Sequence, residues 1–112
     1  MGTTVTDEQI QELVQTAQPF SLVILRWGPR RAQDGAAAIE LEHQRRMVSL
    51  RADGVIAILC PILDEAMAGM AIMTVSTDRA EEIIAEDPCI RAGMMHSEVY
   101  PCMSFPGDSL PG

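Results

Sequence analysis

Three apolar runs constrain the fold of this chain most. Residues 20–28, 55–61 and 69–75 are rich in β-branched and bulky aliphatic side chains, which predicts that each run is a strand. A strand in an antiparallel sheet with one solvated face alternates apolar and polar residues. These runs are apolar on both faces, the first one until Arg26. We therefore expect both faces of the sheet to be covered.

Helical patterns separate the predicted strands. Residues 36–53 carry apolar side chains at helical spacing and are followed by Gly54, which suits a left-handed helix cap. A second helix is expected to begin with Asp78 as its cap, and a final strand covers residues 94–101. The order β-α-β-β-α-β is typical of a ferredoxin-like α+β fold, with a four-stranded antiparallel sheet and both helices on one face.

Both ends of the chain extend beyond this pattern. Residues 1–19 are expected to form an N-terminal helical extension, because Thr6 and Gln9 match a capping box and apolar residues follow on one narrow stripe. We expect that stripe to pack on the body of the protein. Residues 20–101 then form the domain, and residues 102–112, rich in Pro and Gly, form an irregular tail.

The composition limits the classes of partner. The net charge is -8 at pH 7, whereas nucleic-acid binding draws its affinity from Lys and Arg, so no nucleic acid is expected. No apolar run approaches the ~18 residues of a membrane helix. The polar N-terminus predicts no signal peptide, and hence a cytoplasmic protein with reduced cysteines. Since symmetric dimers are the commonest assembly, a second copy of the sheet is the expected cover for the free face.

His43 and Asp87 are the candidate catalytic residues. His43 is predicted on or beside the buried face of helix 36–53, and an imidazole with an ordinary pKa of about 6.5 can act as a general acid or base. Asp87 stands directly before Pro88, where the chain leaves a helix, and a carboxylate can orient a neighbouring imidazole. The alternatives are a core-edge histidine bonded to the backbone and an aspartate that only caps a turn.

Other residues are weaker candidates. Arg26 could stabilise negative charge, or its head could simply reach water from the end of its strand. Met94 is expected in the pocket wall, Ser97 could line a pocket if its face points inward, and His96 is expected on the surface. The three cysteines have no neighbouring base in sequence, which favours inert thiols over nucleophiles. We expect no metal, because the cysteines and histidines match no recognised metal motif.

A set of short motifs is shared with a known family. His43 lies in the first helix of the domain, and Cys60-Pro61 forms a corner after the second strand. Asp87-Pro88-Cys89-Ile90-Arg91-Ala92-Gly93 forms a corner before Glu98-Val99-Tyr100-Pro101. In these features residues 20–101 resemble the YCII family of dimeric α+β-barrel proteins. The chain departs from the family pattern at Cys60, where the family has Gly, and in both terminal extensions.

The resemblance implies a homodimer with a His–Asp pair at the mouth of a small pocket near Pro61. One activity associated with the family is dehydrochlorination in chloroaromatic breakdown, and the superfamily includes lactone isomerases, small monooxygenases and ligand-binding modules. We therefore expect a small enzyme of lyase or isomerase type, without a cofactor, that acts on a hydrophobic or aromatic metabolite. His43 would move a proton, Asp87 would orient His43, and Arg26 would stabilise developing negative charge. A non-catalytic binding protein and a cofactor-free monooxygenase are the alternatives.

Overall fold

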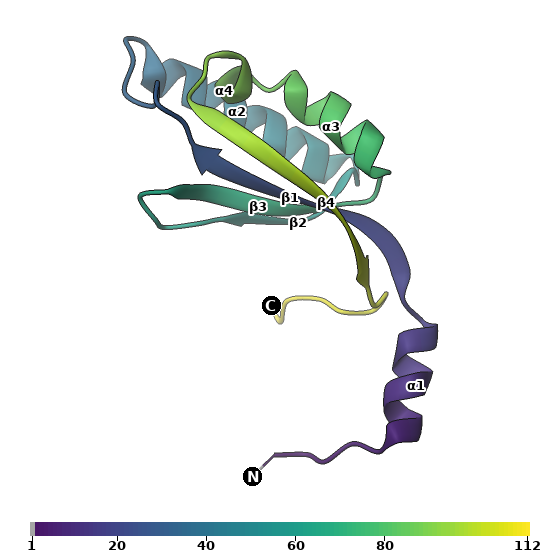
Figure 1. Ribbon diagram of the computed structural model, residues 1–112. Helices are drawn as coiled ribbons and strands as arrows, with labels where there is room; N and C mark the ends of the chain where they lie inside the picture. The colour runs from purple at the N-terminus through teal and green to yellow at the C-terminus, as the bar shows by residue number, and fades with distance from the viewer. Residues whose placement is uncertain (1) are drawn as a thin grey trace.

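The computed structural model describes residues 2–112 and has an α+β architecture. A four-stranded antiparallel sheet has the strand order β2-β3-β1-β4, and α2, α3 and α4 lie over one of its faces (Figure 1). This arrangement is compatible with the predicted ferredoxin-like fold. The elements are α1 (Asp7–Gln15), β1 (Gln18–Trp27), α2 (Ala36–Ala52), β2 (Ile56–Pro61), β3 (Met67–Met73), α3 (Thr77–Ala85), α4 (Pro88–Arg91) and β4 (Met95–Ser104).

The pairing of the strands follows the predicted order. β2 and β3 form an antiparallel hairpin, as expected from the short link between them. β1 lies in the centre and pairs with β3 on one side and β4 on the other. β2 and β4 are therefore the edge strands, which is where a proline such as Pro61 or Pro101 is tolerated, because its missing N–H breaks no central pairing.

The core lies between the sheet and its helices. Val23 of β1 and Met73 of β3 are fully buried on the face that the helices cover, together with Ile84 of α3. Fully burying one such side chain stabilises the fold by about 1.5–3 kcal/mol. The opposite face of the sheet carries half-buried apolar residues such as Leu22 and Ile24, and we call it the open face.

The N-terminal helix does not pack on the body, so that prediction is wrong. α1 has the predicted capping box between Thr6 and Gln9, but none of its residues is buried. Its stripe residues Ile10, Leu13 and Val14 are each 50 or 51% exposed, and the helix projects from the start of β1 (Figure 1). The radius of gyration is accordingly 16.5 Å, above the ~13 Å typical of a compact chain of this length.

Three further details differ from the sequence predictions. α3 is capped by Ser76, which accepts from the Arg79 N–H, and not by Asp78. β4 continues to Ser104, so the irregular tail begins three residues later than predicted. The corner after Asp87 contains one turn of helix, α4, because Pro88 suits the first helical position. Within residues 2–112, no helix combines the length and apolar character needed to cross a bilayer.

Candidate active site

The site begins with the local structure at Asp87. Pro88 disfavours helical geometry for the residue before it, so Asp87 adopts an extended backbone between α3 and α4. From this N-cap position its Oδ2 accepts the Cys89 N–H at 3.0 Å. Gly93, with φ of +73°, then turns the chain into β4. The cap holds the carboxylate in one orientation, and only 1% of Asp87 is exposed.

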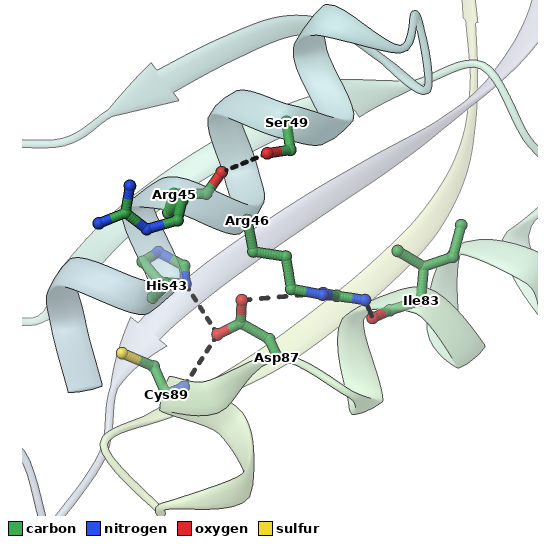
Figure 2. Close-up of polar contacts among 7 residues, drawn as sticks. All are labelled: His43, Arg45, Arg46, Ser49, Ile83, Asp87 and Cys89. Atoms are coloured by element: carbon green, nitrogen blue, oxygen red, sulfur yellow. Dashed lines mark hydrogen bonds and ion pairs between the residues drawn. The ribbon is translucent and has the colours of Figure 1, made fainter.

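His43 contacts this carboxylate from α2. Its Nδ1 lies 2.7 Å from Asp87 Oδ2, and both side chains are buried (Figure 2). The two residues are 44 positions apart in sequence, and the contact forms because α2 packs against α4. Asp87 therefore caps the turn and also contacts the imidazole, so the two roles considered for it in the sequence coexist.

Arg46 is the residue of this network that the sequence reading missed. It projects from α2 beside His43 and donates from Nη2 to the Ile83 carbonyl at 2.6 Å (Figure 2). Its Nη1 lies 3.8 Å from Asp87 Oδ1, and both of these atoms are buried without a hydrogen-bond partner among the described residues. The signal was present, because Arg46 follows His43 by three residues and therefore shares its helix face.

The charges of the network determine which ring nitrogen of His43 carries the proton. The Arg46 guanidinium lies beside the Asp87 carboxylate in a buried setting, so a positive and a negative group offset each other there. An ionised carboxylate can only accept hydrogen bonds, so Nδ1 of His43 carries a proton and its N–H donates a hydrogen bond to Asp87. Nε2 then has a free lone pair, and it has no hydrogen-bond partner within residues 2–112. This is the arrangement of an oriented general base.

Cys89 completes the cluster but is not a nucleophile. Burial, together with the Asp87 and Glu40 carboxylates, raises the pKa of its thiol to about 12, which keeps the thiol neutral. His43, Asp87 and Cys89 each offer one potential metal-ligand atom, and these three atoms lie within 4.8 Å of one another. Residues of these types can bind a metal ion. However, Asp87 Oδ2 already takes two hydrogen bonds and the Arg46 cation lies beside it, so the set suits proton chemistry better.

A cavity of about 330 Å³ lies between α2 and the covered face of the sheet. That volume lies at the lower end of the range for small-molecule sites. His43 lines it, and the other lining residues are mostly apolar. They are Val23, Leu25, Trp27, Glu40, Gln44, Met47, Val48, Leu59, Cys60, Pro61, Ala68, Gly69, Met70, Ala71, Ile84 and Met95.

The structure places only one of the predicted binding residues at this cavity. Pro61 lines it, whereas Met94 is fully buried in the core and Ser97 is exposed on the edge strand β4. Met95, the neighbour of Met94, takes the place in the cavity wall. Glu40 and Gln44 were missed, although they flank His43 at helical spacing.

Arg26 lies on the open face of the sheet, away from the cavity. Leu25 and Trp27 on either side of it face the cavity, so alternation turns Arg26 outward. Its guanidinium pairs with Glu98, which also accepts from the Tyr100 hydroxyl. Bonds from Tyr100 and Arg26 lower the pKa of the Glu98 carboxyl. Exposed His96 pairs with Arg26 in the strand register.

The chain matches no known protein-family profile, and a search of curated proteins finds no relative. The resemblance to the YCII family therefore remains a prediction that rests on the motif residues themselves.

Proposed function

We propose that this chain is a cofactor-independent enzyme of the YCII type, in which His43 moves a proton on a small hydrophobic or aromatic substrate. The reaction would be an elimination, such as dehydrochlorination, or an isomerisation. The observation that carries this proposal is the buried His43–Asp87 pair, which leaves Nε2 of His43 free beside an apolar cavity. An apolar pocket with a few convergent polar groups is a general mark of binding and active sites.

The proposed chemistry follows from the two nitrogens of His43. Nε2 takes a proton from a substrate carbon, while Nδ1–H keeps its hydrogen bond to Asp87. The imidazolium that forms is stabilised by the Asp87 carboxylate. In an elimination, the electron pair of the broken C–H bond forms the new double bond, and the leaving group departs with its own pair. The proton then passes from Nε2 to water.

The charge distribution favours elimination over a long-lived enolate. No arginine is among the residues that line the cavity, and Arg26 is engaged with Glu98 on the other face of the sheet. An enolate would need a cation or donors to stabilise it. In an elimination, the negative charge leaves with the leaving group instead, so the cavity needs no cation.

We also infer that a second copy covers the open face, giving the dimeric α+β barrel that the resemblance implies. The support is the apolar character of Leu22, Ile24 and Ile72 on a face that α2, α3 and α4 do not cover (Figure 1). Covering it with the same surface of a twofold-related chain buries these side chains on both partners. Light scattering coupled to size-exclusion chromatography should give the mass of a dimer, and a stable monomer would contradict this assembly.

The catalytic proposal is tested with the two histidines of the chain. A panel of small β-chloro ketones and lactones is incubated with the protein, and chloride release and exchange of the acidic C–H with deuterium are followed. His43→Ala should abolish both reactions. His96→Ala is the matched control, because His96 lies outside the cavity lining, so its loss should change neither rate.

Two outcomes would contradict the proposal. Turnover that survives His43→Ala would remove His43 as the base. Compounds that bind tightly to the wild type but return unchanged, without C–H exchange, would instead identify a non-catalytic binding protein.

A further inference from the structure

Glu40 is the acidic residue among those that line the cavity. It lies on α2 one helical turn before His43, so the two side chains share a helix face. Glu40 is half-buried and forms no hydrogen bond or ion pair within the part of the chain that the structure describes. Its negative charge also contributes to raising the pKa of the Cys89 thiol, which places the carboxylate close to the site.

No cation among the cavity-lining residues offsets this charge. Arg46 is turned toward Asp87 and Ile83 and is not part of the lining. Arg31 stacks on Trp27, with its guanidinium carbon 3.8 Å from the ring centroid, and donates to the Glu65 carbonyl. The remaining lining is apolar apart from His43, Gln44 and Cys60.

We infer that Glu40 selects the ligand: the cavity accepts a small apolar molecule with an amine or hydroxyl hydrogen-bond donor and rejects carboxylates. This inference rests on the proposed function of the cavity as a ligand site. A half-buried carboxylate without a partner gains a charge-assisted hydrogen bond from a donor on the ligand. An anionic ligand has no donor to offer and meets a like charge in a low-dielectric cavity.

The inference also fits the proposed chemistry. A donor that binds Glu40 fixes one end of the ligand one helical turn from His43 on the same face of α2. The apolar body of the ligand then lies against side chains such as Leu25 and Met47. A carboxylate substrate would bring a third negative charge to a site that already holds Glu40 and Asp87, which is unfavourable.

The test uses three aromatic probes of one shape: benzylamine, benzyl alcohol and benzoate. Trp27 is the single tryptophan and lines the cavity, so its fluorescence and its indole N–H signal report binding. The wild type should bind benzylamine and benzyl alcohol, and should bind benzoate at least about tenfold more weakly. Glu40→Gln keeps the shape but removes the charge. It should weaken benzylamine about tenfold, largely retain benzyl alcohol and strengthen benzoate.

Glu42→Gln is the matched control. It removes the same charge from α2, but Glu42 is exposed, pairs with Arg45 and does not line the cavity. Its affinities for all three probes should equal those of the wild type, which excludes a general effect of the acidic surface. Equal binding of benzoate and benzylamine, or equal effects of Glu40→Gln and Glu42→Gln, would overturn the role of Glu40 while the cavity remained a ligand site. Binding of none of the probes would overturn both this role and the proposed function.

Discussion

Replacing Asp87 with alanine should remove several buried interactions at once. The Cys89 N–H loses its cap, at about 1 kcal/mol, and the buried His43 Nδ1–H loses its acceptor, at about 1–3 kcal/mol. Arg46 also loses its counter-charge, but at 3.8 Å this contact is no hydrogen bond, and the Arg46 side chain is 25% exposed. We therefore expect the free energy of unfolding to fall by about 2–4 kcal/mol, a large part of the ~5–15 kcal/mol typical of a domain.

Equilibrium denaturation in urea measures this loss. The midpoint should fall while the slope with denaturant stays constant, since the surface exposed on unfolding is nearly the same. Asp87→Asn should lose less stability than Asp87→Ala, because the amide oxygen of Asn can still accept a hydrogen bond from the Cys89 N–H or from His43.

Asp64→Ala is the matched control for Asp87→Ala. Asp64 also accepts two backbone N–H groups, from Ala66 at 2.8 Å and Met67 at 3.0 Å, but it is exposed, so water can replace it. Equal midpoint shifts for Asp87→Ala and Asp64→Ala would refute the reasoning, because burial would then not distinguish the two carboxylates.

Three further predictions concern other parts of the chain. Folding raises the pKa of the Cys89 thiol from 9.0 to about 12, so the thiol loses its proton at a lower pH in the unfolded chain than in the folded one. The free energy of unfolding should therefore fall by ~1.4 kcal/mol per pH unit between pH 9.0 and about 12. Cys89→Ala should flatten this slope in a series of denaturation experiments at alkaline pH. Removing residues 2–16 should leave the melting temperature within about 2 °C, because α1 buries no residue, and a larger drop would show that α1 packs on another copy. Gly28→Ala should cost about 1–3 kcal/mol, since a Cβ there would lie 2.6 Å from the Gly93 carbonyl oxygen. Gly2→Ala is the control, because a Cβ there meets no atom within 4 Å, and an equal loss of stability in urea for both variants would contradict the clash.

Most of the fold could be predicted because local signals agreed with one another. Apolar runs marked β1 to β3, Gly54 marked the end of α2 with φ of +78°, and the Thr6–Gln9 capping box marked the start of α1. The packing of α1 could not be predicted in the same way. An apolar stripe shows that a helix has a face to bury, but not which surface covers it.

The two sides of His43 show where prediction of the site stops. Asp87 could be found from sequence because a residue before proline at a helix end is a local feature. The cavity beside His43 could not be predicted from sequence. Residues from α2, α3 and all four strands line it, and they come together only through packing between segments that are distant in sequence. From sequence, Arg26 could either stabilise negative charge in a pocket or reach water, and strand alternation turns it to the open face. The charged side chain at the cavity comes from Glu40 of α2. A strand register shifted by one residue would have turned Arg26 toward the cavity, so the charge of the cavity lining depends on packing and not on a local signal.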